Sequence, residues 1–253
     1  VIEEMDVEHS IYEGRLMLQR EGLDTLICQQ LGLDTPPADM AHWQDIIRKL
    51  IKPRHRVRIG VVGKYVELQD AYKSVYEAVI HGGVANDCGV EITRIEAEDI
   101  EENGAAETLE GCSGILVPGG FGERGAHGKM RAARFAREKN IPCFGICYGM
   151  QLSVIEAARH VANIKGASTT EFGPTDEPVV GLAPPMRARM MEIIRRLAGE
   201  EGIGIMLIEH VIDLVMSGSD VIVVLSSGEV IAEGTPDEIR QNREVLEAYL
   251  GHA

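Results

Sequence analysis

Cys147 carries the strongest chemical signal in this sequence. It follows an apolar run at residues 141–146, and glycines stand two positions to either side, at 145 and 149. The pattern predicts a strand, a tight turn and a helix start, with the thiol exposed at the turn. At a helix N-terminus the helix dipole favours the thiolate, which is the reactive form. These residue types therefore indicate a cysteine nucleophile.

A second segment would complement such a nucleophile. Residues 114–125, GILVPGGFGERG, predict a strand that runs into a glycine-rich loop. A loop of this kind can turn its backbone N–H groups toward an oxyanion, so the two segments together indicate acyl transfer. A cysteine nucleophile also needs a base. No His-x-Glu pair follows Cys147.

His210 is the candidate base. It comes directly after an apolar segment at 204–208, which predicts a strand. Because the strands of one parallel sheet end on the same edge, His210 and Cys147 could emerge on one rim, one or two strands apart. The alternative is that this histidine has no catalytic role.

The motifs ILVPGGFGERG, GICYGMQ and STTEF (168–172) resemble the class I glutamine amidotransferase domain of the CTP synthase family. The resemblance runs from VIEEMDVEHSIYE at the start, through VGKYVELQDAYKSV (62–75), to about residue 172. It implies that Cys147 is the nucleophile and that glutamine is the ligand. It also implies that Gly119, Gly120 and Gly122 shape an oxyanion loop and that Phe121 covers the substrate. Gln151 and Glu171 would contact the amino-acid end of glutamine. Tyr148 stands where the family usually has Leu.

The resemblance leaves two family features unmatched. The family's late His-x-Glu pair, which completes a Cys-His-Glu triad, has no counterpart, so we expect glutamine hydrolysis to be absent or strongly impaired. The ATP- and UTP-binding synthase domain that precedes this region in the family is also expected to be absent.

Residues 176–251 resemble a different family, the C-terminal part of ABC transporter ATPases of the branched-chain amino acid type. In that comparison Asp176-Glu177-Pro178 matches the end of the Walker B segment, and His210 matches the switch histidine. Phosphoryl transfer needs a phosphate-binding loop, and the sequence has neither such a loop nor an LSGGQ-type signature. Lys64 in GVVGKY lacks the Gly-x4-Gly-Lys-Ser/Thr spacing. We interpret the chain as a chimera joined near residues 173–178, without an ATP site.

Alternating strands and helices predict an α/β fold with a mostly parallel, doubly wound sheet. We expect an approach segment at 1–55 with a helix at 39–51, a partial amidotransferase domain at 56–175, and an ABC-ATPase-like αβ segment at 176–253. The strands are expected at 56–62, 90–95, 114–118, 141–146, 204–208, 220–225 and 229–232. Strand 204–208 is expected beside strand 141–146, where it would cover an otherwise open edge. Residues 219–233 are expected to form a hairpin-like unit with Gly228 at its turn.

Composition restricts the function classes. The formal net charge of −15 argues against nucleic acid and anionic membrane surfaces as partners. The sequence has no run of 18 apolar residues and no signal peptide, so we expect no membrane insertion and a cytoplasmic location. The five cysteines show no Cys-x-x-Cys pair, which fits reduced thiols; Cys143 is expected to be a packing residue inside its strand. No cofactor or metal is indicated, and oligomeric partners stay open.

Three functions remain at this point. The chain could be a glutaminase-derived domain that has the thiol and the oxyanion loop but an incomplete triad. It could also be a working thiol hydrolase or amidotransferase with His210 as its base, or a non-catalytic chimeric module.

Overall fold

The computed structural model describes residue 2 and residues 6–180, 184–200, 202–208 and 212–250. At its centre lies a parallel four-stranded sheet in the order β2-β1-β3-β4. Its strands are β1 (His55–Gly63), β2 (Cys88–Glu96), β3 (Gly114–Val117) and β4 (Cys143–Gly145). The four predicted strands of the front region are confirmed, although β4 is shorter than expected.

Helices cover both faces of this sheet. Along β1, Val61 packs toward α4 (Lys73–Ala85), and the next residue, Val62, packs toward the opposite face. That opposite face is covered by α5 (Ala97–Asn103), α6 (Ala105–Thr108) and α7 (Ala126–Lys139). Successive strand residues point to opposite faces, so a strand buried on both sides reads as a continuous apolar run. The α/β, doubly wound fold class is confirmed.

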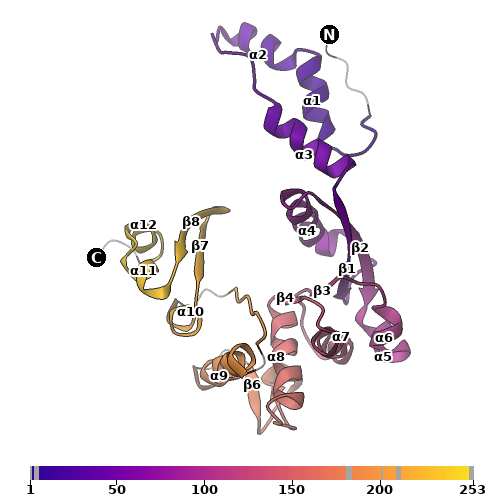
Figure 1. The fold of residues 1–253 in the computed structure, drawn as a ribbon, viewed down its shortest axis with the longest axis vertical. Coiled ribbons are helices and arrows are strands. Elements are labelled where there is room, and N and C mark those ends of the chain that lie inside the picture. Colours follow the sequence, from indigo (N-terminus) through magenta and orange to yellow (C-terminus); the bar gives the residue numbers. More distant parts are fainter. Residues whose placement is uncertain (1, 3–5, 181–183, 201, 209–211, 251–253) are drawn as a thin grey trace.

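The approach segment forms helices that extend away from the sheet (Figure 1). These are α1 (Glu13–Arg20), α2 (Leu23–Leu31) and α3 (Ala41–Ile51). Helix α3 was predicted, whereas α1 and α2 were not. The segment is held by Trp43, whose Nε1 donates to the Tyr12 carbonyl at 2.8 Å, with the two rings edge to face.

Residues 202–208 form no strand, so the prediction that strand 204–208 joins the sheet is wrong. Helices α9 (Pro184–Glu200) and α8 (Tyr148–His160) share one apolar core, and Ile203 and Leu207 pack against that core instead of pairing with β4. Two short strands beside them, β5 (Ser168–Thr169) and β6 (Pro178–Val180), pair in parallel. Without a ladder partner, Met206 and Ile208 stay exposed. β4 is therefore an edge strand.

The remaining tail forms its own small unit with a separate core. β7 (Ile222–Ser226) and β8 (Glu229–Gly234) make an antiparallel hairpin. Ser227 and Gly228 both have positive φ, 51° and 85°, as a two-residue hairpin turn requires, so the expected hairpin is confirmed. Around it lie α10 (Ile212–Gly218), α11 (Pro236–Gln241), α12 (Arg243–Val245) and a single π-helical turn (Leu246–Leu250).

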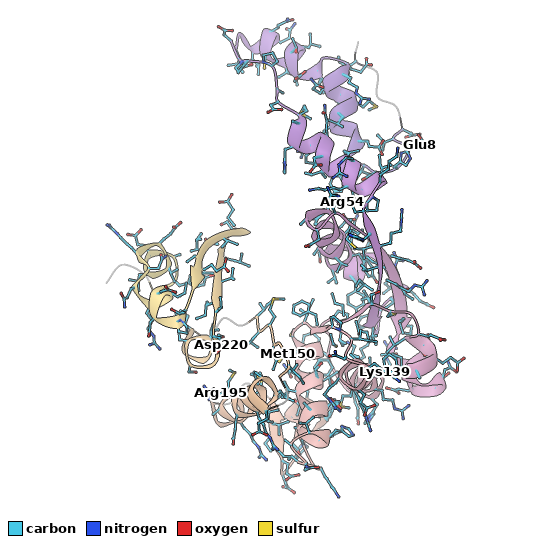
Figure 2. All side chains as sticks on the ribbon, in the orientation of Figure 1. Glu8, Arg54, Lys139, Met150, Arg195 and Asp220 are labelled. Atoms are coloured by element: carbon cyan, nitrogen blue, oxygen red, sulfur yellow. The ribbon has the colours of Figure 1, made fainter. Side chains whose placement is uncertain are left out.

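The tail unit is linked to α9 by side chains. Arg195 of α9 donates to the backbone carbonyl of Ser217 near the end of α10 (Figure 2). Over the part of the chain that the structure describes, no helix has the length and apolar character needed to cross a membrane.

Candidate active site

Cys147 occupies a sharp turn between β4 and α8. Its backbone has φ 51° and ψ −113°, a left-handed conformation that is rare for a residue with a side chain, and it is the residue that precedes the first turn of α8. The flanking positions require glycine because backbone atoms of other residues approach them closely. A Cβ on Gly145 would lie 2.6 Å from the Met150 nitrogen, and a Cβ on Gly149 would collide with the Val117 carbonyl oxygen. The predicted strand–turn–helix geometry around the thiol is therefore present.

Among the five thiols, Cys147 combines exposure with a helix N-terminus. Burial raises the pKa of the Cys112 thiol. Cys143 was expected inside its strand, yet it is exposed because β4 is an edge strand. Desolvation by the surrounding protein nevertheless raises the pKa of Cys143 to about 12, with the Glu156 carboxylate adding to the effect. The exposure is that of the whole residue, whereas the raised pKa reports a desolvated sulfur, which is rarely a thiolate.

The glycine-rich segment 118–122, the predicted oxyanion loop and so named hereafter, lies beside Cys147, the predicted nucleophile. A Cβ built on Gly119 would stand 3.7 Å from the Cys147 Cβ. Gly120 and Gly122 have φ of 155° and 72°, which glycine adopts readily. Phe121 projects outward and is 78% exposed. The structure thus brings the predicted loop to the predicted nucleophile.

Two buried lysines and a tyrosine bond to the carbonyl groups of the oxyanion loop. Lys129 Nζ donates to the carbonyls of residues 118 and 119 at 3.1 and 3.3 Å. Lys64 Nζ donates to those of residues 121 and 122 at 2.5 and 3.4 Å. The Tyr148 hydroxyl donates to the carbonyl of residue 122 at 2.7 Å. The sequence signals missed this cluster, since Lys64 was considered only as part of a phosphate loop and Lys129 lies in an ordinary helical stretch.

The residues expected at the amino-acid end of glutamine lie near the turn at residues 145–149, hereafter the elbow. Gln151 is on the first turn of α8, and its Oε1 is buried without a hydrogen-bond partner. Glu171 is exposed in the short 3₁₀ turn Thr170–Phe172. Phe172 of the same turn meets the Tyr148 ring edge to face, with centroids 6.5 Å apart. Burial, followed by the Glu171 and Glu123 charges, raises the pKa of Tyr148 to about 12.

His210, the candidate base, lies outside the described residues. Within those residues, no histidine forms a hydrogen bond or ion pair with the Cys147 thiol. Several histidines have carboxylate neighbours of their own: His9 lies near Glu13, His81 near Glu77, and His160 near Glu156.

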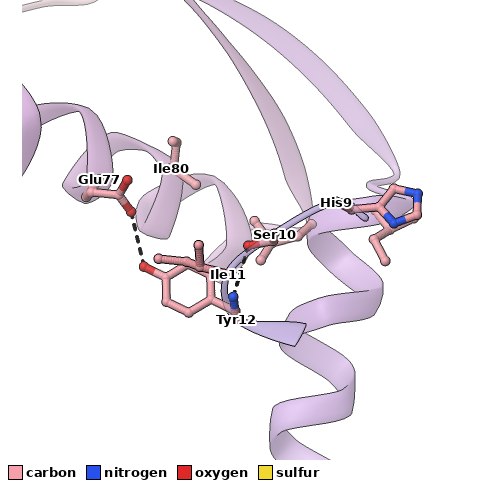
Figure 3. A pocket seen from close by; sticks show the side chains of 8 residues that line it. His9, Ser10, Ile11, Tyr12, Glu77 and Ile80 are labelled. Carbon is pink, nitrogen blue, oxygen red and sulfur yellow. Dashed lines mark hydrogen bonds between the residues drawn. The ribbon is translucent and has the colours of Figure 1, made fainter. Parts of the chain in front are cut away.

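The two best-defined cavities lie away from Cys147. One of about 210 Å³ is lined by residues 9–12 and by α3 and α4, and Figure 3 shows the Tyr12 hydroxyl donating to Glu77 beside it. The other, of about 420 Å³, is lined by α4 and β2. Neither cavity contains a residue of the elbow or of the oxyanion loop.

Known proteins resemble two parts of this chain. Residues 67–200 match the family model "Glutamine amidotransferase class-I", and residues 229–253 match that of "Branched-chain amino acid ATP-binding cassette transporter". The first match continues beyond the predicted junction at 173–178 and includes α9.

Individual relatives give the same result for the front region. The CTP synthase of Hyphomonas neptunium is 58% identical over 184 residues, which is 72% of this chain and 34% of that protein. The CTP synthase of Methylorubrum extorquens is 52% identical over 207 residues, 81% of this chain and 37% of that protein. The chain thus spans about a third of these curated relatives. A solved glutaminase domain of Trypanosoma brucei CTP synthase with bound acivicin is 42% identical, covers 49% of this chain and 48% of its own, and has a TM-score of 0.45.

The matched family model spans more than half of the chain and contains both the elbow and the oxyanion loop. This chain belongs to the class I glutamine amidotransferase family.

Proposed function

We propose that this chain binds glutamine beside Cys147 and that the thiolate attacks the side-chain amide carbon. A C–S bond forms, the C–N bond breaks, and the nitrogen leaves as ammonia after it gains a proton. Water would then hydrolyse the thioester to glutamate and return the free thiol. The observation that carries this proposal is the left-handed Cys147 turn placed against the oxyanion loop.

The unpartnered Gln151 oxygen supports glutamine as the ligand. A buried polar atom without a hydrogen bond is costly, and such atoms are rare in folded proteins. The ammonium group of a bound amino acid would supply the missing donor. Glu171 and Phe121 are proposed as further contacts, because they flank the same site from the turn at 170–172 and from the oxyanion loop.

We further propose that turnover is strongly impaired. A nucleophile without a base lacks a proton acceptor for attack and a donor for the leaving amine. General acid–base help contributes roughly 10²- to 10⁴-fold, so glutaminase activity is expected several orders of magnitude below that of a complete triad. His210 as a substitute base is the rival proposal.

Two measurements test these proposals. A glutamine-analogue electrophile such as acivicin, the compound bound in the trypanosomal relative, is expected to label Cys147 and not the same chain carrying Cys147→Ser. Glutamine turnover by the wild type is expected to be undetectable. Any turnover that is detected is expected to be unchanged in His210→Ala. Clear turnover that collapses in His210→Ala would establish the rival proposal, and absence of Cys147 labelling would reject a glutamine site.

A non-catalytic chimeric module is the second candidate. It is favoured by the tail unit, which has its own core and its own sheet. In this proposal the chain comprises an approach segment at 1–55, a partial amidotransferase domain at 56–175, and an ABC-ATPase fragment at 176–253 without an ATP site. Calorimetric titration with MgATP should show no binding; micromolar affinity would contradict the fragment interpretation.

A further inference from the structure

Four carbonyl groups of the oxyanion loop bond to one small cluster of side chains. Lys64, Lys129 and Tyr148, hereafter the brace, make five hydrogen bonds to the carbonyls of residues 118, 119, 121 and 122. Within a trans peptide unit the C=O and the following N–H point in opposite directions. Holding these carbonyls toward the brace therefore directs the N–H groups of the next residues away from it.

The N–H groups so directed have no acceptor of their own. Among the residues that the structure describes, none accepts a hydrogen bond from the N–H of Gly119, Gly120 or Gly122. Gly119 is also the loop residue that lies against Cys147. Unpaired N–H groups beside a nucleophile are the arrangement that stabilises a tetrahedral oxyanion.

The brace buries two charged lysines, which costs free energy if its role is purely structural. Lys64 is 5% exposed and Lys129 is fully buried. Desolvation lowers the pKa of both ammonium groups, and their mutual repulsion lowers that of Lys129 further. The Glu98 carboxylate is the acidic group that offsets this at both lysines. Two like charges behind one short loop also place positive potential where negative charge would develop.

Tyr148 completes the brace from the elbow itself. It directly follows Cys147, it is 1% exposed, and its hydroxyl bonds to the same carbonyl that Lys64 contacts. The Lys129 Nζ lies 5.8 Å from the centre of the Tyr148 ring, within the range of a cation–π contact. The residue after the nucleophile therefore ties the elbow to the oxyanion loop.

We propose that Lys64, Lys129 and Tyr148 are positioning residues that hold the N–H groups of the oxyanion loop toward the reacting atoms at Cys147. This inference rests on the proposed glutamine site for its catalytic meaning, although the loop geometry is independent of it. The brace acts on the negative charge that develops on an electrophile held in the glutamine position, and not on the thiol, so it should affect two electrophiles differently.

The test compares labelling of Cys147 by acivicin, which must occupy the glutamine position, with alkylation by iodoacetamide, which needs only an accessible thiolate. In Lys129→Met we expect acivicin labelling to slow by about tenfold or more, with iodoacetamide alkylation within about twofold of wild type. Tyr148→Phe removes a single hydrogen bond and should give a smaller effect in the same direction. Lys139→Met, an exposed lysine at the end of the same helix (Figure 2), is the control and should change neither rate.

A second readout separates this inference from the proposed function. In ¹⁵N-glycine-labelled protein, Tyr148→Phe and Lys129→Met should shift the amide resonances of Gly119, Gly120 and Gly122, and Lys139→Met should not. If wild type resists acivicin but the glycine amides shift, the glutamine site is wrong and the brace stands. Unshifted amides, or equal changes in both labelling rates, would overturn the brace. Far-UV circular dichroism checks that each variant is folded. If Lys129→Met does not fold, the same comparisons are made with Tyr148→Phe.

Discussion

Lys129 should give the stability of this protein an unusual dependence on pH. Its ammonium group is fully buried, and desolvation together with repulsion from Lys64 lowers its pKa from 10.5 to about 8. Glu98 is the acidic group that opposes this shift. The perturbation that isolates the effect is Lys129→Met, which keeps most of the side-chain length and removes the titrating group.

The sign follows from proton linkage. Between pH 8 and 10.5 the folded protein holds this lysine neutral, whereas the unfolded chain keeps it protonated. The unfolded state therefore binds more protons, and the free energy of unfolding rises with pH across this window. A difference of about 2.5 pKa units at about 1.4 kcal/mol each corresponds to about 3 kcal/mol, which is the unfavourable contribution at pH 7. Most of it should disappear by pH 10.

Urea unfolding followed by far-UV circular dichroism measures this quantity. The free energy of unfolding of wild type minus that of Lys129→Met should increase by about 2 to 3 kcal/mol between pH 7 and pH 10. Subtracting the variant removes the contributions of groups that titrate equally in both proteins. A flat difference for Lys129→Met, within about 0.5 kcal/mol, would refute a buried charged lysine at this position.

Three further outcomes are expected. Cys147 should be the first of the five thiols alkylated by iodoacetamide at pH 7, as read by peptide mass spectrometry, because it alone combines exposure with a helix N-terminus; earlier alkylation at another cysteine would contradict this. Gly149→Ala should destabilise the protein by on the order of 3 kcal/mol in urea unfolding, since its Cβ would collide with the Val117 carbonyl, and a loss below about 1 kcal/mol would show that the turn relaxes. Glu156→Ala should cost roughly 3 kcal/mol, because this buried carboxylate accepts hydrogen bonds of 2.7 and 3.2 Å from Arg137, whereas an unchanged urea midpoint would show that the pair contributes nothing.

The local elements of the front region could be predicted from the sequence. The strands predicted at 56–62 and 114–118 alternate with helical segments and became parallel strands; the buried end of the first, residues 60–62, and the second are apolar because both faces of the sheet are covered there. The Cys147 turn was predictable for the same kind of reason, since Gly145 and Gly149 are the only residue type that fits their positions. The hairpin turn at Gly228 likewise follows from residue type alone.

The partners of these elements were decided only by the tertiary structure. Residues 202–208 have the composition of a strand but pair with no strand; Ile203 and Leu207 pack instead against the core that α8 and α9 share. A strand's hydrogen bonds come from another segment, so composition cannot say whether they form.

The brace shows the same division at the candidate active site. The type and spacing of residues 119–122 and Cys147 indicate their chemistry in the sequence. Nothing in the sequence distinguishes Lys64 and Lys129 as part of this site. They become part of the site because the end of β1 and helix α7, which are distant in the sequence, bring them to different carbonyls of the same loop. Sequence thus determined which residues could react and which turn could hold them. The buried charges that orient the loop depend on contacts between distant segments, and only the folded chain creates those contacts.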